Sequence, residues 1–120
     1  MGQYPIAIYA IVGLFILLDI VTGISQAVFN KTMDSKVLRN GMFHKLSYIF
    51  AIVLALALEW SCNYMELGFE CRILLPLVVY IVITEAVSVL ENILKLNPEL
   101  SDSPIFKLLS ENMKRRKDDD

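Results

Sequence analysis

The sequence predicts an all-α integral membrane protein with three transmembrane helices and a short cytoplasmic amphipathic helix at its C-terminal end. Hydrophobic residues make up 56% of the 120 residues, and most of them gather in three long runs. Each run is long enough to cross the hydrocarbon core of a bilayer, which takes about 20 residues. The charged residues collect mainly in the connections and the tail. Residues 1–120 are therefore expected to form a single membrane domain.

The apolar runs and the polar tail set the expected boundaries. The three spans are expected at about residues 6–29, 46–65 and 73–96, with a cytoplasmic tail over 97–120. The alternative is a soluble bundle, in which each helix would carry a polar face along its full length. Ile6–Leu18 contains only Tyr9 as a partly polar residue, which disfavours that alternative.

The distribution of basic residues predicts the orientation in the membrane. The connection over residues 30–45 carries one acid, Asp34, and four basic residues, Lys31, Lys36, Arg39 and Lys45. Short loops rich in Lys and Arg remain on the cytoplasmic side. This basic loop and the Lys- and Arg-bearing tail are therefore expected inside, with the 66–72 connection and the N-terminus outside.

The tail is expected to contain a helix that lies on the inner membrane surface. Asn97-Pro98 should break the third span, and Ser103-Pro104 is a favourable helix start, with Ser as N-cap and Pro in the first turn. Apolar residues then recur at helical spacing, followed by a Lys-Arg-Arg-Lys run: they are Ile105, Leu108, Leu109 and Met113. This pattern is typical of an interfacial amphipathic helix. A solvated charged tail over residues 114–120 is the alternative.

Polar residues form stripes within the apolar spans. The candidate polar seam comprises Asp19, Thr22, Gly23 and Gln26 in the first span, Glu59 in the second, and Glu85, Ser88, Glu91 and Asn92 in the third. Lipid offers no hydrogen-bond partner, so these groups must face protein or water. Either they join the spans within one monomer, or they line an oligomer seam or a water-filled lesion. Asp19 and Glu85 lie near mid-membrane, and we expect their ionisation to be coupled.

The sequence offers little support for an enzyme or a metalloprotein. The chain has one His, His44, in the basic loop, and its Ser, Thr and Cys residues have no base at useful spacing. No catalytic residue, cofactor or metal site is predicted, and a net charge of −2 disfavours nucleic acid as a partner. Cys62 and Cys71 are expected near the outer face, either as a disulfide or as two free thiols.

Two segments resemble the signature of the toxin-secretion/phage-lysis holin family. The first comprises Asp19-Ile-Val-Thr22-Gly23, Ala27, Ser35-Lys36, Gly41 and Lys45. The second is Ser88-Val-Leu-Glu91-Asn92, followed by a Lys and a Pro-containing loop. The resemblance extends from Leu14 to about Leu109. Asn97 departs from it, because it stands where the pattern has Gly after the third span.

This resemblance implies a phage- or prophage-encoded holin in the cytoplasmic membrane of the bacterial host. Such a protein self-associates and opens lesions through which a cytoplasmic endolysin reaches the peptidoglycan and causes host cell lysis. Some relatives are implicated in the secretion of large toxins. The expected partners are the lipid bilayer and further copies of the chain, with endolysin or toxin as released cargo. Two alternatives remain: a small oligomeric ion channel or transporter component, and a non-lytic membrane scaffold or antiholin.

Overall fold

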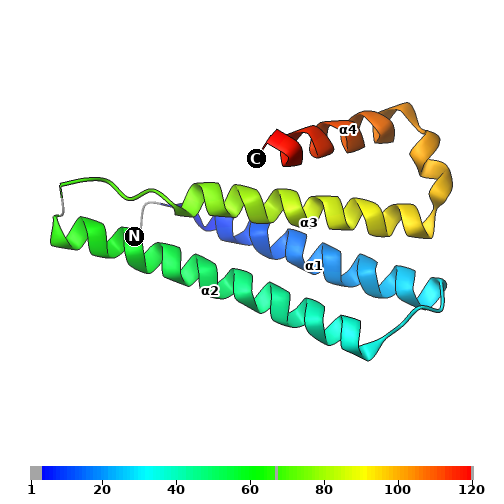
Figure 1. Cartoon of the computed structure of the whole chain (residues 1–120), viewed down its shortest axis with the longest axis horizontal. Helices are drawn as coiled ribbons and strands as arrows, with labels where there is room; N and C mark the ends of the chain where they lie inside the picture. The colour runs from blue at the N-terminus through cyan, green and yellow to red at the C-terminus, as the bar shows by residue number, and fades with distance from the viewer. Residues whose placement is uncertain (1–3, 67, 120) are drawn as a thin grey trace. The chain divides into compact units, whose positions relative to one another are not determined.

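The computed structural model describes residues 4–66 and 68–119, and every regular element in this part of the chain is a helix. The elements, labelled in Figure 1, are α1 (Ile6–Phe29), α2 (Ser35–Met65), α3 (Leu74–Leu96), the 3-10 helix η1 (Pro98–Asp102) and α4 (Pro104–Asp119). α1, α2 and α3 are long and apolar enough to cross a membrane. The all-α fold class with three spans is confirmed.

The second helix begins at Ser35, much earlier than the apolar run starting near Leu46 suggested. The Asp34 side chain caps it by accepting a hydrogen bond of 2.9 Å from the Lys36 backbone N–H. No Pro interrupts the sequence that follows, so the backbone stays helical through the charged residues. The predicted basic loop over 30–45 is therefore wrong as a loop: most of its length is the polar first part of α2.

The third helix ends where the sequence predicted, at Leu96. Asn97 has φ −144° and ψ 86°, which is outside the helical region that the residue before a proline disfavours. The helix therefore ends because Pro98 follows, and not through the left-handed cap that a glycine here would favour.

The fourth helix starts at Pro104, as expected, and its first turn closes with a 3.0 Å hydrogen bond from the Lys107 backbone N–H to the Ser103 carbonyl. Two of its apolar side chains, Ile105 and Leu108, are 78% and 61% exposed. The expected amphipathic pattern also included four residues of α4 whose side chains the structure does not describe: Met113, Lys114, Arg116 and Lys117.

The chain divides into two compact units, and each draws on more than one helix. The first unit combines Met1–Val12 with Asp34–Ile81, and the second combines Gly13–Met33 with Val82–Asp120. The buried apolar side chains of the first unit are Val12, Tyr48, Ala55, Leu74, Val78 and Ile81. In the second unit, Ala86 and Leu90 are buried beside the carboxylate-bearing residue Glu85 along α3.

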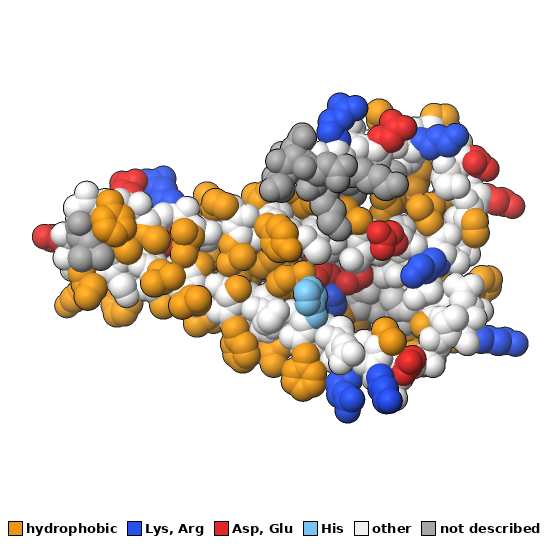
Figure 2. All heavy atoms as spheres, viewed as in Figure 1, with side chains coloured by type: hydrophobic (Ala, Val, Ile, Leu, Met, Phe, Trp, Pro, Cys, Tyr) orange, Lys and Arg blue, Asp and Glu red, His pale blue; other side chains and the backbone are white. Residues whose placement is uncertain are grey.

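Large apolar side chains remain exposed along α2. Phe50, Val53 and Leu54 are each at least 58% exposed. Figure 2 shows hydrophobic side chains along the visible face of this helix, with Lys and Arg side chains near the end where it begins. A continuous apolar surface of this kind is costly in water and favourable against lipid. The exposure pattern agrees with α2 as a membrane span.

Candidate functional site

One side chain on α3 holds a short polar segment of α1. The Asn92 amide nitrogen, Nδ2, lies 3.0 Å from Asp19 Oδ1 and 3.1 Å from Thr22 Oγ1. An Asn amide has two N–H donors, which matches these two acceptors. All three residues belong to the second unit and are half-buried. We call this group, Asp19, Thr22 and Asn92, the Asn92 clamp.

The α1 backbone prepares Thr22 for the clamp. The Thr22 hydroxyl donates to the Leu18 carbonyl one turn earlier, at 2.7 Å. This bond consumes the only hydroxyl proton and leaves the oxygen lone pairs as acceptors, which is the role that Asn92 requires. Ser25 makes the same kind of bond to the Val21 carbonyl at 2.7 Å. In a segment without water, such local bonds satisfy hydroxyl groups.

Gly23 gives the Asn92 side chain its space. A Cβ added at Gly23 would lie 3.5 Å from Asn92 Nδ2, which is ordinary van der Waals contact. Atoms beyond Cβ would compete with the amide for this space. Gly13, in the same helix, has no atom within 4 Å of an added Cβ. A small residue is therefore needed at position 23, because the Asn92 side chain lies beside it. Gly13 has no such neighbour.

Asn30 extends the contact between α1 and α3, and the sequence analysis missed it. Its Nδ2 donates to the Lys95 carbonyl at 3.3 Å and lies 3.4 Å from Gln26 Oε1. Asn30 follows Gln26 by one turn, so it continues the stripe that starts at Asp19. The helical spacing was the available signal, but Asn30 lies just beyond the apolar run and was assigned to the connection.

The other predicted seam residues of α3 differ in exposure. Glu85 is 2% exposed, Ser88 is half-buried and Glu91 is exposed. Asn92 lies about two turns beyond Glu85 along α3. The α3 residue in the Asp19 contact described above is thus Asn92. The coupling between Asp19 and Glu85 stays a prediction.

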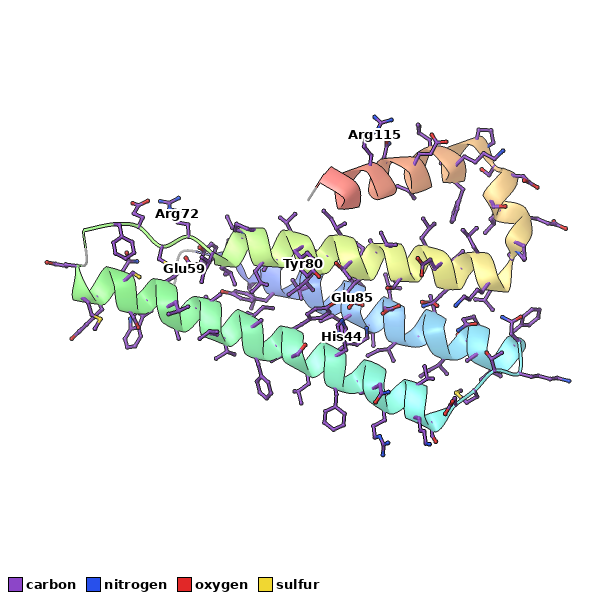
Figure 3. The ribbon with its side chains drawn as sticks, viewed as in Figure 1. His44, Glu59, Arg72, Tyr80, Glu85 and Arg115 are labelled. Carbon is purple, nitrogen blue, oxygen red and sulfur yellow. The ribbon has the colours of Figure 1, made fainter. Side chains whose placement is uncertain are left out.

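Glu59 belongs to a different contact, within the first unit. Its Oε2 accepts a 2.7 Å hydrogen bond from the backbone N–H of Leu74, the first residue of α3. Its Oε1 accepts a 2.5 Å hydrogen bond from the Tyr4 hydroxyl. A carboxylate at a helix N-terminus satisfies an otherwise unpaired N–H and interacts favourably with the helix dipole. Figure 3 shows Glu59 reaching from α2 toward the start of α3.

The predicted basic residues lie on the connection and on the polar first part of α2. Lys31 is exposed and has a left-handed backbone with φ 57°, which turns the chain after α1. Lys36 and Arg39 are exposed on α2, whereas Lys45 is half-buried. Among residues 4–66 and 68–119, no group of three or more His, Cys, Asp or Glu side chains is placed to hold a metal ion.

The sequence matches the bacteriophage holin family over residues 1–112. The chain belongs to this family. No curated protein and no solved structure matches it. The match covers almost the whole chain, including all three spans and the segments that form the Asn92 clamp.

Membership in the holin family agrees with the described architecture. A holin is a membrane protein without enzymatic activity, and three helices of spanning length make this chain a multi-pass member. In this holin, the α1 part of the first segment that carries the resemblance meets the α3 segment directly through Asn92. The role of this contact in holin action is taken up below as a proposal.

Proposed function

We propose that the chain oligomerises in the bacterial cytoplasmic membrane and forms lesions that release an endolysin or a toxin from the cytoplasm. Membership in the holin family is the observation that carries this proposal. The three spans supply the membrane part, and the polar groups on α1 and α3 supply contacts that lipid cannot provide.

An exposed carboxylate supports self-association. Glu91 is exposed on α3, one position before Asn92 and within the span. A charged side chain facing hydrocarbon costs about 2.5–3.5 kcal/mol on insertion scales at the bilayer centre, and less toward the interface. Contact with another copy, or with water inside a lesion, removes this cost. The seam residues would therefore serve two purposes. The Asn92 clamp would join α1 to α3 within a monomer, and Glu91 would contact another copy or water inside a lesion.

The orientation proposed for the chain has the N-terminus outside and the C-terminus in the cytoplasm. Support comes from Lys31, Lys36 and Arg39, which are exposed between α1 and the apolar part of α2. Lys and Arg at this position favour the cytoplasmic side. The exposed Ile105 and Leu108 of α4 would then lie against the inner leaflet, as in other interfacial helices.

Induced expression in bacteria, with and without a co-expressed endolysin, tests the lesion proposal. We expect loss of viability and membrane potential in both cases, and cell lysis only with the endolysin. Collapse of the potential without endolysin-dependent lysis would instead indicate an ion channel. Retention of both viability and potential would indicate a scaffold or antiholin.

Two Asn variants connect this test to the structure. Asn92→Leu removes the clamp while keeping a side chain of similar size, and we expect it to alter lysis timing at equal protein level. Asn63→Leu is the matched control, because Asn63 is exposed on α2 and lies outside the clamp. Equal lysis timing in wild type and both variants would remove the clamp from the mechanism.

A further inference from the structure

Cys62 and Cys71 lie on the two sides of the connection between α2 and α3. Cys62 is in the last part of α2, and Cys71 precedes α3. Both are free thiols and half-buried. Neither residue takes part in the Asn92 clamp or in the resemblance to the holin family, so their proximity requires an explanation of its own.

The Glu59 contact brings these two cysteines together. Glu59 on α2 accepts a hydrogen bond from the Leu74 N–H at 2.7 Å, which fixes the first turn of α3 against α2. Cys62 follows Glu59 by three residues, on the same side of the helix. Cys71 precedes Leu74 by three residues. The two thiols therefore lie three residues from one fixed contact, on the two segments that this contact joins.

We propose that Cys62 and Cys71 form an intrachain disulfide when they meet an external disulfide. One cysteine, as its thiolate, attacks the reagent R–S–S–R and releases one thiol R–SH. The second cysteine then displaces the remaining R–S group, which forms the Cys62–Cys71 bond and releases a second R–SH. Two cysteine thiols are oxidised, one external disulfide is reduced, and the two protons end on the released thiols.

The surroundings of Cys71 disfavour its thiolate form. Partial burial raises the pKa of the Cys71 thiol, and the Cys62 hydrogen bond and the nearby Glu59 charge raise it further. The reactive thiolate is therefore scarce at neutral pH. In the orientation proposed above, the pair lies on the outer side of the membrane, where disulfides persist. The new bond would covalently join the last part of α2 to the segment before α3. The Glu59–Leu74 hydrogen bond already holds these two segments together noncovalently.

The full chain in detergent micelles allows a direct test. The protein is incubated with oxidised glutathione or with a reductant, denatured, and then treated with excess maleimide before mass spectrometry. We expect two maleimides on the reduced chain, and none on the oxidised chain, whose mass falls by that of two hydrogen atoms. A peptide joining Cys62 to Cys71 and a monomer on a non-reducing gel complete the expected result.

Two single variants distinguish this bond from other causes. Cys62→Ser and Cys71→Ser each leave one thiol, which should bind one glutathione or one maleimide under the same oxidising conditions. Disulfide-linked dimers of the wild type, or glutathione on both of its cysteines, would overturn the intrachain bond. Absence of maleimide from the reduced single variants would also overturn it, because the wild-type result would then reflect inaccessible thiols. These outcomes do not depend on lesion formation.

Discussion

The side-chain amide of Asn92 lies 3.0 Å from the Asp19 carboxylate and so joins α3 to α1 in the second unit. The same amide reaches Thr22 Oγ1 at 3.1 Å, one turn further along α1. The contact pairs an uncharged donor with a carboxylate, in a part of the chain expected to lie in the membrane. The predictions below begin with this pair.

Loss of the amide should weaken the fold without preventing insertion. We expect Asn92→Leu to lower the free energy of unfolding by about 1–2 kcal/mol, because hydrogen bonds between membrane helices contribute on average about 0.6 kcal/mol each, and up to about 1.7. Unfolding by titration with a denaturing detergent, followed by circular dichroism, measures this difference. Asn63→Leu should be close to wild type. An equal loss in both variants would show that the effect is not specific to the clamp.

Gly23 should tolerate one added carbon and reject a larger side chain. Gly23→Ala places its Cβ at an acceptable 3.5 Å from Asn92 Nδ2, so we expect near-normal lysis. Gly23→Leu should displace the amide, leaving insertion intact while weakening crosslinked oligomers and lesion formation. Gly13→Leu is the matched control in α1, because its Cβ would have no atom within 4 Å. Equal oligomer yield and killing in the Gly23→Leu variant and wild type would contradict this role.

The charge of Asp19 should matter separately from its hydrogen bond. Asp19→Asn keeps an oxygen that accepts from Asn92, so we expect normal accumulation and insertion. If the charge of Asp19 contributes to lesion opening, this variant should trigger late or not at all. Lysis timing at matched protein level measures the effect. Wild-type timing in this variant and in Asp19→Asn/Glu85→Gln would leave both carboxylates with a structural role alone.

The hydrogen bond between Tyr4 and Glu59 predicts a pH dependence at high pH. The bond raises the pKa of Tyr4 above its ordinary value. A raised pKa in the folded state means that Tyr4 stabilises the fold fully below the unfolded tyrosine pKa. This contribution is lost as pH rises through the folded pKa. We therefore expect Tyr4→Phe to be less stable than wild type at pH 7, with the difference shrinking in strong alkali.

The phenolate absorbance of Tyr4 is obtained by subtracting the titration curve of Tyr4→Phe from that of the wild type. It should rise at a higher pH than the absorbance of an unbonded tyrosine, because the pKa of Tyr4 is raised. A free tyrosine derivative in the same detergent supplies the reference. Coincident titration of Tyr4 and this derivative would argue against a persistent bond to Glu59.

The orientation can be tested with single reporter cysteines in a chain whose own cysteines are replaced by serine. A membrane-impermeant maleimide added to intact cells, with the outer envelope permeabilised, should modify a cysteine at Gln3 or Gly68 and leave one at Asn40 unmodified. The basic residues around Asn40 are the reason for this expectation. Modification at Asn40 before lysis would reverse the proposed orientation.

Helix boundaries were predictable to different degrees, for reasons that lie in particular residues. α1 and α3 follow their apolar runs closely, and Pro98 and Pro104 mark boundaries because proline restricts its own φ and the preceding residue. The start of α2 was missed because the hydrophobic pattern reports burial in lipid and not helicity. The N-cap Asp34 was the better signal, since its carboxylate accepts from the Lys36 N–H.

The candidate site was only partly predictable. Helical spacing correctly grouped Asp19, Thr22 and Gly23 on one side of α1, and it identified Asn92 as a polar residue of the third span. It did not show which α3 residue meets Asp19, because that depends on how far one helix is shifted along the other. The Tyr4–Glu59 bond was similarly out of reach, since it joins residues far apart in the sequence.

The spacing of the acceptors on α1 makes sliding between α1 and α3 directional. If Asn92 moved one turn, about 5.4 Å, toward the start of α1, it would meet Phe15 and Leu18, which offer its amide no side-chain acceptor. One turn the other way, it would meet Gly23 and Gln26, and the Gln26 carbonyl can accept. Translation toward the Gln26 end thus keeps a side-chain acceptor beside Asn92, whereas the reverse step places Phe15 and Leu18 where Asp19 and Thr22 now lie. We therefore expect displacement of this part of α3 along α1 to cost less toward Gln26 than toward Phe15.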